Sequence, residues 1–203
     1  MNAFQEVPAS KSSIARRKLV HGVGVNDTNY KPHQSVNGKV LYCPYFAKWR
    51  AMIHRCYSGH CVAYAGCSVD DKWLLLSVFK FWMKSQDWNG MQLDKDLKIK
   101  GNKVYSENAC LFIPHKLNTI LNGRKAARGL YPQGVSLATR NRGFISRINK
   151  SGSLKHLGYF NTPKEASKAY QQARTDKIQV LIDNNTYPMA TQYLSQHINQ
   201  GSN

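Results

Sequence analysis

The feature that most constrains the fold of this chain is a set of three strand-like segments followed by one capped helix. The segments are QGVSLA (133–138), RGFISRIN (142–149) and LKHLGYF (154–160), and turns rich in Asn, Arg, Gly and Ser separate them. Thr162 then precedes a helical segment with Glu165 three residues later, the pattern of a capping box. We predict a three-stranded antiparallel sheet covered by one helix.

In the middle segment the side chains alternate between the two faces of this sheet. Phe144, Ser146 and Ile148 share one face. Ile145 and Arg147 lie on the opposite face, which is therefore expected to be partly basic.

The charge of the chain is one-sided. Lys and Arg number 29 against 11 acidic residues, which gives a formal net charge of +18. From Asn108 to Lys164 there is no acidic residue, whereas ten Lys or Arg occur. Surfaces of globular proteins usually mix both signs, so a long tract of one sign indicates a polyanionic partner. The alternative is a basic protein whose charges serve solubility alone.

The sequence disfavours a membrane partner and a secreted disulfide scaffold. No run of 18 apolar residues occurs, and the basic tract alternates like a strand instead of forming an amphipathic basic helix. The start of the chain lacks the pattern of a secretory signal, and the five cysteines are odd in number and irregularly spaced. We therefore expect no membrane contact and a cytoplasmic, reducing location.

The residues before the sheet predict helices and short strands around an aromatic core. Phe46, Trp49, Ile53 and Cys56 recur at helical spacing, and a second aromatic-rich helix follows. We expect helices at 45–57, 73–88 and 115–123 and short strands at 91–97 and 110–114. The fold class is therefore α+β. Changes in composition divide the chain into a flexible basic arm (1–20), a first domain (21–122), a linker (123–130), a second domain (131–183) and a tail (184–203).

The second domain resembles the Apetala-type (ethylene-response-factor-like) DNA-binding domain. The resemblance is carried by Gly134-Val135-Ser136, the spaced Phe144, Ser146 and Ile148, Leu157-Gly158-x-Phe160-x-Thr162, and Glu165-Ala166 with Ala169-Tyr170. Proteins of that family lay a three-stranded sheet in the major groove of DNA. The resemblance implies that the partner is double-stranded DNA and that the DNA-facing residues are Arg140, Arg142, Arg147, Lys150 and Lys155. RNA is less favoured as a partner because the chain carries no RNA-binding signature.

Residues 21–122 resemble the core of HNH (ββα-metal, His-Me finger-like) endonucleases, which are encoded by phages and mobile introns and include homing endonucleases. The resemblance rests on the spacing of Trp49-x-x-Met52, Arg55-Cys56-Tyr57, Trp73, Phe79 and Trp82, followed by LDKD, GNK and YS. It implies an α+β fold in which an N-terminal ββα-metal domain precedes the sheet and its helix. It also implies a phage-encoded enzyme acting in the host cytoplasm.

The same resemblance implies a set of catalytic residues: Asp94, Lys95, Asp96, Asn108, His115 and Asn118. Asp94 and Asn118 are the implied ligands of a divalent cation, Mg²⁺ or Mn²⁺, which would neutralise charge on the leaving oxygen and help to activate water. Because Asp94 and Asp96 alternate along a strand, only one is expected to be a direct ligand, with Asn118 or His115 opposite.

The identity of the general base stays open. The family uses a histidine, whereas Lys95 stands near that position in this chain. A lysine with an ordinary pKa of about 10.4 is protonated at neutral pH, so it would act as a cation unless burial lowers its pKa. Asp96 and His115 are the alternatives. Two hypotheses follow: a homing-type DNA endonuclease whose C-terminal sheet recognises the site, and a catalytically inactive DNA-binding phage protein.

The cysteines suggest one further metal site. Cys43, Cys56, Cys61 and Cys67 lie near His54 and His60 in the sequence, so a structural Zn²⁺ is one interpretation. Their spacing contains no C-x-x-C knuckle, and the other interpretation is a set of reduced, buried or half-buried thiols.

Overall fold

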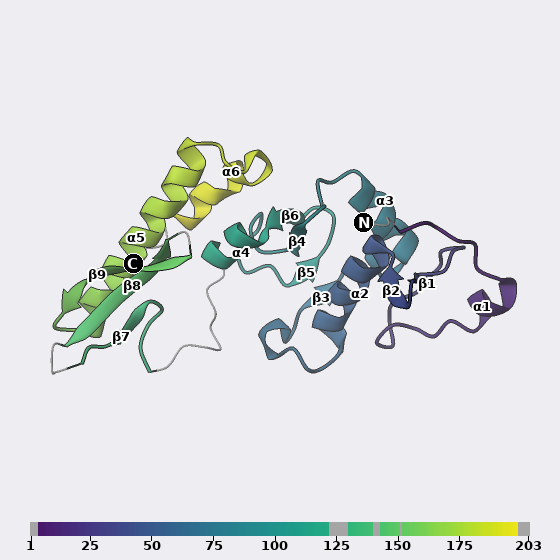
Figure 1. Ribbon diagram of the computed structural model, residues 1–203, viewed down its shortest axis with the longest axis horizontal. Coiled ribbons are helices and arrows are strands. Elements are labelled where there is room, and N and C mark those ends of the chain that lie inside the picture. Colours follow the sequence, from purple (N-terminus) through teal and green to yellow (C-terminus); the bar gives the residue numbers. More distant parts are fainter. Residues whose placement is uncertain (1–3, 122–129, 140–142, 151, 199–203) are drawn as a thin grey trace. The chain divides into compact units, whose positions relative to one another are not determined.

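The computed structural model describes residues 4–121, 130–139, 143–150 and 152–198. The chain forms two compact units, Met1–Ile113 (unit 1) and Pro114–Asn203 (unit 2). Helices and strands occur in both, and Figure 1 labels them along the chain. The predicted α+β class is confirmed at this level. Within the described residues, no helix combines the length and apolar character needed to cross a membrane.

Unit 1 contains three helices and six short strands in its described part. The helices are α1 (Lys11–Ala15), α2 (Pro44–Tyr57) and α3 (Leu76–Lys84). The strands are β1 (His33–Val36), β2 (Lys39–Tyr42), β3 (Ser68–Val69), β4 (Met91–Asp94), β5 (Val104–Tyr105) and β6 (Leu111–Pro114). They pair as β1–β2, β3–β5 and β4–β6.

The core of unit 1 forms where the aromatic faces of α2 and α3 meet. Trp49 of α2 is fully buried, and its indole N–H donates to the carbonyl of Trp73, 2.8 Å away. The rings of Trp73 and Trp82 lie 4.5 Å apart, and Phe112 of β6 stacks on Trp82 with ring centroids 5.7 Å apart. These contacts attach the β4–β6 pair to the helices. The helix predicted at 45–57 is confirmed. The one predicted at 73–88 is shorter at both ends: a 3₁₀ turn (Asp71–Leu74) replaces its start, and α3 ends at Lys84.

The segment expected to be a flexible arm is attached to the rest of unit 1. The guanidinium of Arg17 donates to the backbone carbonyls of Asn26, Thr28 and Tyr30. Lys80 forms a 2.6 Å ion pair with Glu6 and lies 4.2 Å from the ring centre of Tyr30. The arm is therefore part of the folded unit in its described portion, unlike the segment that composition alone predicts.

Unit 2 contains the predicted sheet. Its strands are β7 (Val135–Leu137), β8 (Phe144–Lys150) and β9 (Ser153–Phe160), antiparallel in the order β7-β8-β9. Its helices are α4 (His115–Leu121), α5 (Pro163–Asp183) and α6 (Pro188–Leu194). The capping box is confirmed, because Thr162 and Glu165 exchange hydrogen bonds of 3.1 and 3.2 Å. Figure 1 shows α5 lying along the sheet, and it packs against all three strands.

Helix α4 belongs to unit 2 instead of closing the first domain at residue 122. The guanidinium of Arg174, on α5, donates to the carbonyls of Ile120 and Leu121 at 3.1 and 3.0 Å. A cation at the last carbonyls of a helix is favourable both as a cap and against the helix dipole. The boundary between the units therefore precedes α4, and the predicted linker at 123–130 lies mostly outside the described residues.

Candidate functional site

The register of the sheet defines two faces with different exposure. Ser146 pairs with Val135 and with Gly158, and its side chain is completely buried. Arg147 pairs with His156, and both side chains are exposed. Because α5 packs against all three strands, the face that carries Ser146 is the one that α5 covers. On the face that carries Arg147, Ile145 is buried, whereas Arg147, Asn149, His156 and Tyr159 are exposed to solvent.

A β-bulge decides which residues share the open face. The register shifts between Ser146 and Arg147, so β9 contributes one extra residue there. His156 and Tyr159 consequently lie on the same face although they are three residues apart, and their ring centroids are 4.8 Å apart. We call this surface the sheet face; its described residues are Ser136, Ile145, Arg147, Asn149, Leu154, His156 and Tyr159.

The sheet face is free of negative charge. Neither it nor any other part of β7, β8 and β9 contains an acidic residue. The described acids of unit 2 are Glu165, Asp176 and Asp183, all on α5. The cation Arg147 therefore lies among polar and aromatic neighbours with no carboxylate on its own sheet to neutralise it.

The predicted DNA-facing residues divide into three groups. Arg147 lies on the sheet face, as predicted. Lys155 is exposed but pairs with Ile148, so it belongs to the opposite face, and His156 takes the place beside Arg147. Arg140, Arg142 and the side chain of Lys150 lie outside the described residues. The resemblance selected Lys155 and not His156, whose side chain lies on the sheet face because of the extra residue between His156 and Gly158.

In unit 1, Asp94 ends β4 and organises the turn that follows. Its Oδ1 accepts hydrogen bonds from the backbone N–H groups of Asp96 and Leu97, at 2.9 and 2.7 Å. An aspartate that accepts from the backbone two and three residues later forms a local turn in place of a continued strand. The predicted strand at 91–97 therefore stops at Asp94, and the alternation expected for Asp94 and Asp96 does not apply.

Lys95 is buried in this turn and makes two hydrogen bonds there. Its side-chain ammonium donates to Asp96 Oδ1 at 2.7 Å and to the carbonyl of Asn102 at 2.6 Å. The Asn102 amide donates to the carbonyls of Lys95 and Val104, and its Oδ1 accepts from the Val104 N–H. Asn102, which belongs to the GNK segment of the resemblance, thus joins the two ends of the loop between β4 and β5.

The other candidate residues lie further along the chain. Asn108 is exposed in the connection between β5 and β6. His115 is the first residue of α4 and is exposed, whereas Asn118, one turn later, is half-buried. The structure therefore brings Asp94, Lys95 and Asp96 together in one turn of unit 1, while His115 and Asn118 belong to unit 2.

The cysteines do not form a recognisable ligand set in the described part of the chain. No group of three or more His, Cys, Asp or Glu residues there is arranged to hold a metal ion. Cys43 is buried with its sulfur 3.6 Å from the Tyr30 hydroxyl. Burial, with the nearby Cys67 thiol, raises the pKa of Cys56 to about 11. Cys56 is thus a protonated thiol at neutral pH, and all five cysteines are free, which agrees with the interpretation as reduced cysteines.

Comparison of the chain with models of protein families, with curated proteins and with solved structures gives no match.

Proposed function

We propose that the protein binds duplex DNA through the sheet face of unit 2. The observation that carries this proposal is the open face of β8 and β9, on which Arg147 lies beside His156 and Tyr159 without a carboxylate on the sheet. Arginine binds phosphates and guanine edges with its planar fork, and asparagine pairs with adenine. Asn149 of the same face is exposed and supplies such an amide. The resemblance to the Apetala-type domain supports the same partner.

The second part of the proposal is that the protein is an HNH-type endonuclease of the homing or phage kind, which hydrolyses phosphodiester bonds of the bound DNA. The order of elements supports it: β4 and β6 pair, and α4 follows β6 directly in the chain. The candidate ligand Asp94 offers carboxylate oxygen atoms, the donor type that Mg²⁺ and Mn²⁺ prefer. A bound cation would supply charge neutralisation at the leaving oxygen. The turn fixes the orientation of the Asp94 carboxylate through Oδ1.

A DNA-binding protein without hydrolytic activity is the second candidate. It is favoured by the contacts of the Asp94-Lys95-Asp96 turn, because hydrogen bonds within the loop account for all three side chains. Under this hypothesis the turn is a structural element of unit 1, and the basic surface of unit 2 carries the function.

Incubation of supercoiled plasmid with the full chain in Mg²⁺, in Mn²⁺ or in EDTA separates the two candidates. The endonuclease hypothesis predicts nicked or linear product with either metal and none in EDTA. Asp94→Asn is the informative variant, since an asparagine oxygen still accepts the two turn hydrogen bonds while the charge is removed. Its product should fall to background with DNA affinity unchanged. Bound but uncut plasmid with the wild-type chain in both metals would instead establish the second candidate.

DNA binding itself is tested by the dependence of affinity on salt. Arg147→Gln should lower the slope of log K against log[salt] by about 0.9 for one lost phosphate contact. Lys155→Gln is the matched control, because it removes one exposed charge from the opposite face of the same sheet. Equal changes in both variants would contradict binding through the sheet face.

A further inference from the structure

A second basic region lies in unit 1, on a part of the chain that the sheet face does not involve. Between Asp27 and Asp70 there is no acidic residue, while five Lys or Arg and three His occur. Helix α2 is in the middle of this tract and presents part of it to solvent. This tract, like the strands of the sheet, therefore contains basic residues and no acidic ones.

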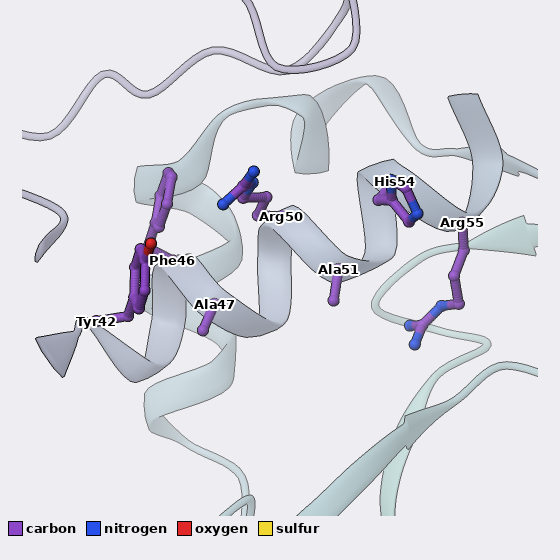
Figure 2. A pocket seen from close by; sticks show the side chains of 7 residues that line it. All are labelled: Tyr42, Phe46, Ala47, Arg50, Ala51, His54 and Arg55. Atoms are coloured by element: carbon purple, nitrogen blue, oxygen red, sulfur yellow. The ribbon is translucent and has the colours of Figure 1, made fainter. Parts of the chain in front are cut away.

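An open groove of about 450 Å³ runs along the exposed side of α2. Figure 2 shows Arg50 and His54 projecting from one side of the helix and Arg55 from the other. Ala47 and Ala51 also line the groove, project on the same side of the helix as Arg55, and are exposed, so these two positions carry no bulky side chain. No acidic residue is among those that line it.

A second histidine, His21, contacts His54 at one end of the groove. His21 Nε2 lies 3.2 Å from His54 Nδ1, with the rings 5.0 Å apart. Partial desolvation, followed by the charges of His54, Arg50 and His60, lowers the pKa of His21. These groups repel one another when protonated, and a bound anion would relieve that repulsion.

Arg55 supplies a donor at the same groove. Its guanidinium lies 5.6 Å from the ring centre of Tyr64 and 5.3 Å from that of Tyr105, so aromatic faces hold it in place. Its Nε is buried and has no hydrogen-bond partner among the described residues.

We propose that the α2 groove binds the phosphodiester backbone of duplex DNA, as a contact surface additional to the sheet face. The inference rests on the proposed function in taking DNA as the partner. Arg50 provides an exposed fork for phosphate, and the small Ala47 and Ala51 let a strand approach the helix. An open groove without a deep recess suits the backbone better than an extruded base, so this contact positions DNA without reading its sequence.

Histidine footprinting of the full chain tests this contact and the sheet face in one measurement. Diethyl pyrocarbonate modifies exposed neutral imidazoles, and mass spectrometry then gives a rate for each site with and without a short DNA duplex. His54 reports the groove and His156 reports the sheet face, since both are exposed. The proposal predicts a several-fold slower modification of His54 in the presence of duplex.

The outcomes distinguish the two surfaces. Slower modification of both histidines supports both contacts. Protection of His156 alone overturns the groove contact and leaves the proposed sheet contact standing. Protection of His54 alone overturns the sheet contact and supports the groove contact. Protection of neither rejects both. Dextran sulfate at equal charge is the control for shape: if it protects His54 as well as duplex does, the groove is a general polyanion site and the proposal is wrong.

A charge-matched pair of variants provides an independent check. Arg50→Gln should reduce the salt slope of DNA binding by about 0.9. Arg16→Gln removes the same charge from an exposed position of unit 1 that does not line the groove. It should leave the slope unchanged. An equal reduction in both variants would show a long-range charge effect and overturn the contact.

Discussion

Replacing Asn102 by alanine should destabilise unit 1 by an amount that the structure allows us to work out. The side chain makes three hydrogen bonds to the backbone: to the carbonyls of Lys95 and Val104 at 3.0 and 2.6 Å, and from the Val104 N–H at 3.1 Å. At about 1 kcal/mol for each bond, their loss amounts to about 3 kcal/mol. Water reaches part of this loop and replaces some of the lost bonds, so the net cost should be about 2 kcal/mol.

Urea unfolding followed by tryptophan fluorescence measures this cost in unit 1 alone, because all four tryptophans lie between residues 49 and 88. With a slope of about 2 kcal/mol per molar urea, the midpoint should fall by about 1 M. Asn108→Ala is the control, since Asn108 is exposed in the same half of unit 1 and should cost no more than about 0.5 kcal/mol. If the two variants unfold at the same urea concentration, Asn102 does not hold the loop together and the argument fails.

Three further predictions concern other parts of the fold. Arg17→Ala should cost about 2 kcal/mol in the same assay because three backbone carbonyls lose their donor, whereas Arg16→Ala should cost little. Gly134→Ala should destabilise unit 2 by about 3 kcal/mol, because Gly134 has a φ of +78° and an added Cβ would lie 1.9 Å from the Tyr170 ring. Faster hydrogen exchange of the α5 amides would measure this loss of stability. Burial raises the pKa of Cys110 to about 12, so at pH 8 about one Cys110 thiol in ten thousand is ionised. Iodoacetamide should therefore label Cys110 only in urea. Rapid labelling in native buffer would contradict its burial.

The sheet and its helix were predictable because local signals agreed with the tertiary structure. Alternation marked β8, and the Thr162 and Glu165 pair marked the start of α5. The composition of the sheet face was only partly predictable, because one extra residue in β9 changes the side of every residue beyond it. The sequence signal for such an irregularity was a glycine within the strand, Gly158, and in the structure its φ is +147°.

Unit 1 contains a tight turn at an Asn-Gly pair, Asn37-Gly38. Asn37 and Gly38 both have positive φ and join β1 to β2, which is the tight hairpin that an Asn-Gly pair favours. The residues that flank this pair are not strongly apolar, so alternation alone does not predict two strands there. At Asp94 the prediction gave too long a strand. Apolar alternation suggested a strand that continues to residue 97, whereas the Asp94 side chain accepts backbone N–H groups and ends the strand.

The contacts of Lys95 narrow the search for a general base in the proposed enzyme. Its ammonium donates to Asp96 and to a backbone carbonyl, so it offers protons there and no lone pair for a substrate water. Asp96 already accepts one of those bonds. His115 is the only imidazole between Gln92 and Asn118, and its side chain is exposed at the start of α4. If plasmid nicking is observed, His115 is therefore the first residue to test as the general base. Its replacement by alanine should cost little folding stability, because the side chain is exposed.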